Sequence, residues 1–255
     1  MKISCLTMAY NEELIMPYFL KHYENLDEIR VLFETDTNDS TRELLDKPNV
    51  KIVDCHIENG LNDIEKAKLI NRELSQMDSD WVYVLDTDEF VFPFGNEDTK
   101  SFFKRQKDYT VVIAAMYQVY RHKTDLDLNP LLPPIPQRVH GDPDLYSTVQ
   151  EMNRDCNWHY VKPCIVRPGV SFLPGNHETI GEYIISPDTF TGAHWQMADP
   201  AIALHRRLQR RARISPENRK RLMGFQHFNV TAEYILEECK RHENDPIIED
   251  LCCVI

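Results

Sequence analysis

Short apolar runs alternate with longer amphipathic segments along the first 120 residues. Enrichment in β-branched and aromatic residues predicts strands in the runs, and apolar residues three and four apart predict helices between them. The predicted strands are Lys2–Tyr10, Ile29–Phe33, Val50–Cys55, Trp81–Leu85 and Tyr109–Tyr120. The predicted helices are one that begins at Asn11, whose side chain we expect to cap it, and Arg42–Leu45, Asp63–Met77 and Asp98–Arg105. This order predicts a mostly parallel α/β sheet with right-handed crossovers.

The second half of the chain has a different composition. Residues 122–148 are rich in Pro, Asp and Leu, which predicts a long loop over the ligand site. Strands at Trp158–Arg167 and Thr189–Trp195 follow, and a helical C-terminal tail covers Pro200–Arg213, Pro216–Gly224 and Thr231–His242. Since no repeat or linker interrupts the chain, we expect a single domain over residues 1–255. Its expected parts are a nucleotide-binding half (1–121), an acceptor-side half (122–198) and C-terminal helices (199–255).

Composition narrows the class of protein. A net charge of −12 and a pI near 5.3 argue against nucleic-acid binding, because surfaces that follow phosphates are basic. Seven cysteines without a C-x-x-C pair or a signal peptide indicate a reducing compartment. No apolar run approaches the roughly 20 residues that span a bilayer. We therefore expect a cytoplasmic protein whose association with membranes is peripheral at most.

The C-terminal residues Cys252-Cys253-Val254-Ile255 have the form of a prenylation signal. No polybasic stretch adjoins them, and so short a motif often matches by chance. An apolar end packed against the body is the simpler expectation.

Polar side chains follow three predicted strands at the point where each strand ends. Asn11 and Glu12 follow the first, an acidic turn begins at Glu34, and Asp86 and Asp88 follow the central apolar run. The carboxyl ends of parallel strands meet at one edge, where ligands of such sheets bind. Paired carboxylates suit Mg²⁺ or Mn²⁺, although aspartate is also common in plain turns. The sequence has no Gly-rich phosphate loop, so a phosphate would be bound by a metal and side chains.

Four motifs in this order resemble one enzyme family. They are Ala9-Tyr10-Asn11-Glu12, the turn from Glu34 to Thr41, Asn71, and Leu85-Asp86-Thr87-Asp88-Glu89-Phe90. Over about its first 120 residues the chain resembles the GT-A-fold glycosyltransferases of the family 2-like kind. The resemblance implies a Rossmann-like α/β fold and metal-dependent transfer of a sugar from a nucleoside-diphosphate sugar to an acceptor hydroxyl.

The resemblance also implies roles for individual residues. Ala9, Asn11 and Glu12 would line the nucleotide pocket, and Glu34 and Asp39 lie in the turn near the base or ribose. Glutamate at position 34 and serine at position 40 depart from the family's usual aspartate and glycine, which leaves the nucleotide open.

The D-x-D pair has the role most closely tied to the reaction. Asp86 would face the ribose or the metal, and Asp88 would bind Mn²⁺ or Mg²⁺, which stabilises the leaving diphosphate. The expected donor is a UDP-sugar, and the expected acceptor is a saccharide or a glycolipid.

Further candidates in the second half follow from their chemistry. His177 and His194 are candidate third metal ligands, because a neutral imidazole suits this role, although a single histidine is more often structural. Arg206 and Arg210 share a helix face and are candidates to bind the diphosphate, with a solvated cationic face as the alternative.

The candidate general bases for the acceptor hydroxyl are Glu178 and Asp188. Asp142 and Asp144 compete with them, and a carboxylate in an ordinary turn is the alternative explanation for Glu178.

Two other functions stay open. A non-catalytic scaffold that binds a nucleotide or glycan would carry the same motifs. A phosphatase of the haloacid dehalogenase type also has D-x-D after a strand, but on its first strand and with Thr or Val at the position of Phe90. For a glycosyltransferase we expect Asp88→Asn to lower transfer without unfolding the protein. We also expect Thr87 to face the opposite side of an extended segment and to serve as a control.

Overall fold

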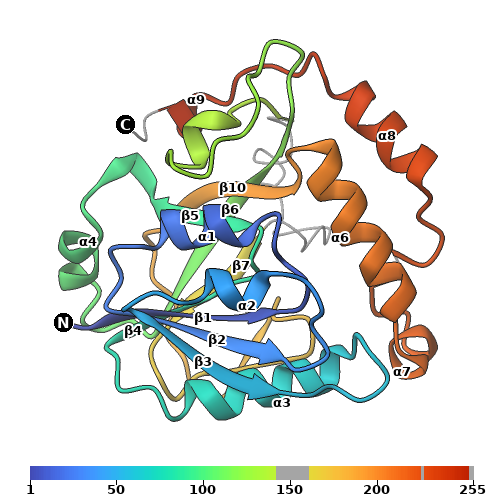
Figure 1. The fold of residues 1–255 in the computed structure, drawn as a ribbon. Coiled ribbons are helices and arrows are strands. Elements are labelled where there is room, and N and C mark those ends of the chain that lie inside the picture. The colour runs from blue at the N-terminus through green and yellow to red at the C-terminus, as the bar shows by residue number, and fades with distance from the viewer. Residues whose placement is uncertain (142–160, 225–226, 253–255) are drawn as a thin grey trace.

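The computed structural model describes residues 1–141, 161–224 and 227–252. Its centre is an eight-stranded sheet in the order β3-β2-β1-β4-β7-β6-β10-β5 (Figure 1). The strands are β1 Ile3–Ala9, β2 Glu28–Glu34, β3 Val50–Cys55, β4 Trp81–Val84, β5 Glu89–Pro93, β6 Val111–Tyr120, β7 Val161–Val166 and β10 Phe190–Met197. A separate antiparallel hairpin consists of β8 Ser171–Phe172 and β9 Thr179–Ile180.

The sheet is mixed, with its parallel part at the predicted place. Strand β1 pairs in parallel with β2 and β4, and β2 pairs in parallel with β3. Strand β7 runs antiparallel between β4 and β6, and β5 runs antiparallel to β10 at the edge. The predicted α/β class with a mostly parallel sheet is confirmed. The sequence did not predict β5, because five residues directly after a turn give no clear period.

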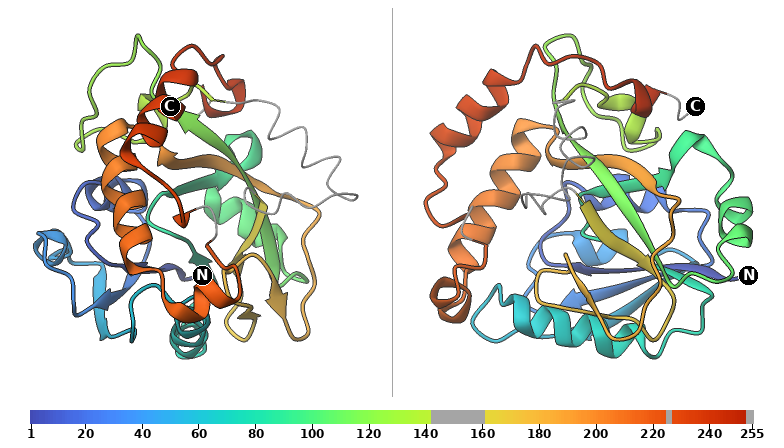
Figure 2. Two further views of the ribbon diagram at one scale, coloured as in Figure 1. Left: turned by 90° about the vertical axis from the view of Figure 1, so that its right-hand side faces the viewer. Right: turned by 180° about the vertical axis from the view of Figure 1, so that it is seen from behind.

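Helices flank the sheet on both faces (Figures 1 and 2). They are α1 Met16–His22, α2 Thr41–Leu44, α3 Asp63–Leu74, α4 Thr99–Arg105, α6 Pro200–Arg213, α7 Pro216–Lys220, α8 Ala232–Arg241 and α9 Glu249–Cys252, with 3-10 turns η1 Phe94–Asn96 and η2 Ile135–Gln137. The side chains of Asn62, Asp199 and Thr231 cap α3, α6 and α8. Such caps satisfy amides of the first turn, which explains why these starts match the predictions.

The first predicted helix begins later than expected. Residue Ile15 is the N-cap of α1, and Asn11 lies outside the helix with a positive φ of 49°. The Asn11 amide instead bonds to Asn38: Nδ2 donates to Asn38 Oδ1 at 2.8 Å, and Asn38 N–H donates to Asn11 Oδ1 at 2.8 Å. The predicted cap is therefore wrong, because a distant loop competes for the same amide.

Alternate residues of the central strands face two apolar clusters. Trp81 and Tyr83 pack with Phe19 of α1 in the larger cluster. Val82 packs with Ile70 of α3 on the opposite face. The helices therefore bury both faces of the parallel strands, as strands of this kind require.

The C-terminal helices stand at the edge toward which the arrows of β1, β2 and β3 point (Figure 1). The end of α6 is joined to the loop before α3, because Leu61 N–H donates to Arg213 O at 2.7 Å and Ser215 N–H donates to Leu61 O at 3.0 Å. This places the arginines of α6 over the strand ends. Among the described residues no helix is both long and apolar enough to cross a membrane.

The described part of the predicted loop, residues 122–141, contains η2 and returns to the end of β6, where Tyr120 N–H donates to His140 O. It contributes no lining residue to the two cavities described below. Residues 142–148 of the predicted loop, the start of the predicted strand at Trp158, and the C-terminal residues 253–255 lie outside the described residues.

Candidate functional site

The D-x-D motif forms a tight turn between β4 and β5. Glu89 N–H donates to Asp86 O at 3.1 Å, and Asp86 N–H donates to Glu89 Oε2 at 2.9 Å. Trp195 N–H donates to Asp88 O at 2.7 Å, which ties the turn to β10. The motif is therefore held rigidly by backbone bonds on both sides.

Two lysines bind Asp86. Lys66 Nζ of α3 donates to Oδ1 at 2.6 Å, and Lys162 Nζ of β7 donates to Oδ2 at 3.2 Å. Lys162 is almost fully buried and also pairs with Glu89. A buried lysine inside an apolar strand needs such partners, since an isolated buried charge is costly.

Asp88 lies beneath the arginines of α6. Its carboxylate is buried, with Arg206 Nη2 3.0 Å from Oδ1 and Arg210 Nη2 3.8 Å from Oδ2. His194 Nε2 of β10 lies 3.4 Å from Oδ2. Arg206 and Arg210 thus share one face of α6 that lies against the D-x-D motif, and their role in binding a diphosphate stays a prediction.

Arg206 connects two strand ends. Its Nη1 donates to Glu12 Oε2 at 2.5 Å and to Thr87 Oγ1 at 2.7 Å. The expectation that Thr87 faces away from the site is wrong, because a turn and not an extended segment carries it. Thr87 is therefore unsuitable as an inert control.

The end of β2 meets the last turn of α6. Glu34 pairs with Arg213, whose guanidinium carbon lies 3.3 Å from the centre of the Tyr10 ring. A cation over an aromatic face is attracted by the ring quadrupole. The ends of β1 and β2 and the last turn of α6 are thus in contact with one another.

Three neighbouring cavities at this edge share Asp86 and Arg210, and two of them contain most of the charged residues described above. The first cavity is lined by Met8, Tyr10, Glu12, Glu34, Leu61, Lys66, Asp86, Thr87, Arg206, Gln209, Arg210 and Arg213. The second cavity is lined by Asp86, Glu89, Gln118, Tyr120, Lys162, His177, His194, Gln196, Met197, Arg207, Arg210, Tyr234 and Glu238.

Burial and ion pairing oppose each other on these carboxyl groups. Burial raises the pKa of Glu12, Glu34 and Glu89, and their cationic partners offset only part of this effect. Burial acts in the same direction on Asp86 and Asp88, but neighbouring lysines and arginines hold the pKa of both well below its usual range. The aspartates are therefore ionised, and the glutamates take up protons more readily than usual.

The charges in this region balance. The five acids are Glu12, Glu34, Asp86, Asp88 and Glu89, and the five cations paired with them are Lys66, Lys162, Arg206, Arg210 and Arg213. An anionic ligand therefore enters a polar region without excess positive charge.

Three residues assigned to the nucleotide pocket do not line the first cavity. Ala9 is fully buried, and Asn11 supports the loop through Asn38. Asp39 accepts hydrogen bonds from the backbone N–H groups of Glu13 and Thr41, at 3.1 and 2.9 Å. These residues shape the loops of the site, whereas Glu12, Glu34, Asp86, Arg206 and Arg210 line the cavity.

The geometry does not support either candidate general base. Glu178 is exposed at the β8–β9 hairpin and lines neither cavity. Asp188 lies before the start of β10, away from both cavities, where it accepts from Arg105 Nη2 at 3.2 Å and Gln106 Nε2 at 2.7 Å. Asp142 and Asp144 lie outside the described residues.

The donor atoms decide which predicted ligands fit a metal. Both Asp88 oxygens are buried and are paired with Arg206 at 3.0 Å and His194 at 3.4 Å, although neither pair has the geometry of an ordinary hydrogen bond. A carboxylate and a neutral imidazole are side chains that can bind a divalent cation. Asp86 fits poorly, since lysines bind both of its oxygens. His177 lines the second cavity, but it forms no group of three close ligand atoms with these residues in the described chain.

Sequence reasoning missed both lysines of the site. Lys162 carried a usable signal, because a single lysine within the apolar strand Val161–Val166 is unusual unless it has a buried partner. Lys66 carried none, since lysine is ordinary on an amphipathic helix such as α3.

Comparisons with known proteins give distant structural similarities. No family model matches the sequence, and no curated protein was found to match it. Among solved structures, S. aureus TarS is 14% identical, with a TM-score of 0.43, and the match covers 95% of this chain and 43% of that one. S. aureus TarS 1–349 in complex with UDP-GlcNAc is 13% identical, with a TM-score of 0.44, and the match covers 90% and 72%.

A second solved protein matches a shorter part of the chain. Glucosyl-3-phosphoglycerate synthase from Mycobacterium tuberculosis, in complex with Mn²⁺, UDP-glucose and phosphoglyceric acid, is 16% identical with a TM-score of 0.32. The match covers 46% of this chain and 44% of that one. All of these TM-scores are below one half, so we draw no functional assignment from them.

Proposed function

We propose that the chain transfers a sugar from a nucleoside-diphosphate sugar to an acceptor hydroxyl, as its resemblance to GT-A glycosyltransferases implies. The observation that carries this proposal is the first cavity, where carboxylates from three strand ends meet Lys66 and the arginines of α6. Arginine and lysine are the side chains that bind phosphate oxygens. The strand-end position is also where α/β sheets bind nucleotides.

The two ends of the first cavity suit the two ends of a nucleoside diphosphate. Met8, Leu61 and Tyr10 provide apolar and aromatic surface for a base, with the Glu34 carboxylate beside them. Arg206 and Arg210 lie beside the D-x-D turn and provide charge for the diphosphate. We expect a UDP-sugar as the donor.

A divalent metal belongs to this proposal through Asp88 and His194. When bound, Mn²⁺ or Mg²⁺ would act as a Lewis acid that stabilises the negative charge of the leaving diphosphate. The chain also places a positive charge beside the diphosphate. Glu12 and Thr87 accept hydrogen bonds from Arg206, which hold its guanidinium at the D-x-D turn.

The second cavity suits a saccharide acceptor. Tyr120 and Tyr234 provide aromatic surface, and Gln118 and Gln196 provide amides that can bond to hydroxyls. Glu89 lines this cavity and has a raised pKa, so it replaces Glu178 and Asp188 as the candidate general base.

The test combines donor binding with product formation. UDP-, GDP-, CDP- and dTDP-sugars are titrated by calorimetry with Mn²⁺ or Mg²⁺, and transfer to saccharide acceptors is followed by mass spectrometry. Lys66→Met should weaken binding of the preferred donor at least about tenfold, which corresponds to about 1.4 kcal/mol. Lys68→Met on the same helix is the matched control, because Lys68 is exposed and lines neither cavity.

Three outcomes separate the alternatives. If none of these donors binds with either metal, the proposal is wrong. If both lysine variants bind equally, the donor lies elsewhere. Binding without transfer to any acceptor would identify a non-catalytic scaffold.

A further inference from the structure

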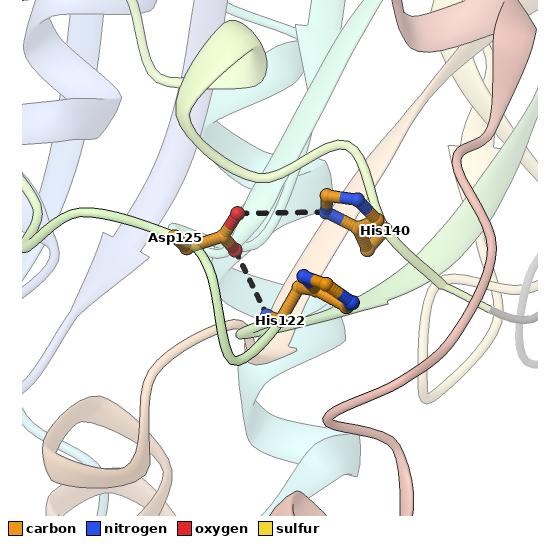
Figure 3. A group of neighbouring side chains, drawn as sticks. All are labelled: His122, Asp125 and His140. Carbon is orange, nitrogen blue, oxygen red and sulfur yellow. Dashed lines mark hydrogen bonds and ion pairs between the residues drawn. The ribbon is translucent and has the colours of Figure 1, made fainter.

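A second group of metal-ligating side chains lies away from the strand-end cavities. His122 and Asp125 follow β6, and His140 follows η2 (Figure 3). One ligand atom from each of the three lies within 4.8 Å of the others. We propose that His122, Asp125 and His140 form a binding site for a Zn²⁺-like transition metal. None of the three lines either cavity described above, so this inference goes beyond the proposed function.

The backbone brings the three residues together. Tyr120 N–H at the end of β6 donates to His140 O at 2.9 Å, which aligns the chain around His140 with the strand. Asp125 closes a turn with His122, since Asp125 N–H donates to His122 O at 3.0 Å. The cluster is therefore set by main-chain bonds and does not depend on chance proximity of long side chains.

The Asp125 carboxylate is oriented toward His140. Its Oδ2 accepts from the backbone N–H of His122 at 2.9 Å, and its Oδ1 lies 3.5 Å from His140 Nδ1 (Figure 3). Two ligand atoms on a tetrahedral zinc ion, with bonds of about 2.0–2.2 Å, lie roughly 3.3–3.6 Å apart. The spacing of Oδ1 and Nδ1 therefore matches one edge of such a site.

The pairing of His140 Nδ1 is weak. This atom is buried, and Asp125 Oδ1 lies 3.5 Å from it without the geometry of an ordinary hydrogen bond. Buried polar atoms normally have closer partners, and a poorly paired one calls for an explanation such as an ion. A metal bound between Nδ1 and the Asp125 carboxylate would satisfy it.

The His122 ring is placed to complete the set. The Thr124 backbone N–H donates to its Nδ1 at 3.2 Å, and Thr124 Oγ1 lies 2.7 Å from the same nitrogen, so Thr124 holds the ring in its present orientation. The ring now stacks on His140, with centroids 4.2 Å apart, so binding requires His122 to turn.

The donor set selects the class of metal. Two imidazoles and one carboxylate suit Zn²⁺, Co²⁺ or Ni²⁺ and disfavour Mg²⁺ and Ca²⁺. Three protein ligands leave a fourth position for water. Arg138 Nη1 lies 3.8 Å from Asp125 Oδ2, the oxygen that does not face His140, and Arg138 is itself shared with Asp199.

The proposed metal site also lies next to the C-terminal part of the chain. His140 forms a β-bridge with Ile247, and Lys123 N–H donates to Glu243 O at 2.9 Å. A metal at the cluster would therefore stabilise the folded chain by binding it in preference to the unfolded chain.

The test uses the whole chain, stripped with chelator and dialysed, with no nucleotide sugar present. Co²⁺ is added and its visible absorption recorded, and Zn²⁺ is titrated by calorimetry. We expect one Zn²⁺ site, a Co²⁺ spectrum that Zn²⁺ abolishes, and a melting temperature raised by Zn²⁺ and not by Mg²⁺. Asp125→Asn, which keeps the side chain's size, and His140→Asn should each weaken Zn²⁺ binding at least about tenfold.

The matched control is His56→Asn. His56 also pairs with a carboxylate, Asp36, at 3.3 Å, but on the surface and without a third ligand. It should leave Zn²⁺ binding unchanged. The proposal is overturned if Zn²⁺ neither binds the wild-type chain nor raises its melting temperature. It is also overturned if Asp125→Asn and His140→Asn, both folded by circular dichroism, bind Zn²⁺ like the wild type.

Discussion

Replacing Asp88 by asparagine should destabilise the fold as well as lower activity. Asp88 and Arg206 are both almost fully buried, and their charged atoms lie 3.0 Å apart. Removing one partner of a buried pair typically costs about 3–5 kcal/mol, because the remaining charge stays buried. Arg206 keeps Glu12 and Thr87 as partners, so we expect a loss near the lower limit, about 3 kcal/mol. The sequence-based expectation that this substitution spares the fold treated Asp88 as a solvent-facing residue.

The assay is thermal and denaturant unfolding of Asp88→Asn beside the wild type. For a domain of this size, a loss of about 3 kcal/mol lowers the melting temperature by about 6–12 °C. Asp54→Asn is the matched control, since Asp54 pairs with Arg42 at 2.7 Å on the exposed surface, where ion pairs contribute little. Equal melting temperatures for the two variants would refute the buried pairing of Asp88 with Arg206.

Three further predictions follow from particular contacts. His22 is buried, and its Nε2 lies 3.1 Å from Val91 O. Burial lowers the pKa of His22 to about 4, so the folded chain binds this proton only at a lower pH than the unfolded chain does. Stability should therefore fall by up to about 3 kcal/mol as pH drops from 6.5 to 4, and His22→Gln should flatten this part of a pH–stability curve. Gly60→Ala should lower both stability and donor affinity, measured by melting and calorimetry, because a Cβ there would lie 2.3 Å from Arg213 O at a φ of 84°. Lys162→Met should abolish transfer and raise the pKa of Asp86, observable by NMR titration of the carboxyl carbons, because Lys162 is the largest opposing charge.

The fold was largely predictable because its signals are local. The strand Val50–Cys55 and the helix Pro200–Arg213 lie where the sequence predicts them, and in the structure the Asp199 side chain caps the helix. The start of α1 was missed because the Asn11 amide bonds to Asn38, 27 residues away. Antiparallel β5 was missed because five residues after a turn show no clear period, and its pairing partner β10 is distant along the chain.

The candidate site was predictable only in part, for the same reason. Asp86 and Asp88 were recognised because their spacing after a strand is a local pattern. Lys162 is 76 residues from Asp86, and no local pattern links them. Glu178 was a candidate because a carboxylate can act as a general base, and the β8–β9 hairpin leaves it exposed. Positions along a chain indicate which residues can do chemistry, whereas pairing between distant residues decides which of them face the ligand.

The balance of charges at the strand ends has a consequence for any diphosphate that binds there. Five acids and five cations cancel, so the two negative charges of a diphosphate need additional positive charge from outside the pairs. A divalent cation beside Asp88 and His194 would supply it. Proton uptake would supply it too, because burial raises the pKa of Glu12 and Glu34, which line the first cavity. The D-x-D motif alone does not indicate whether a metal or protons would supply this charge. The charge balance depends on lysines and arginines from three other elements.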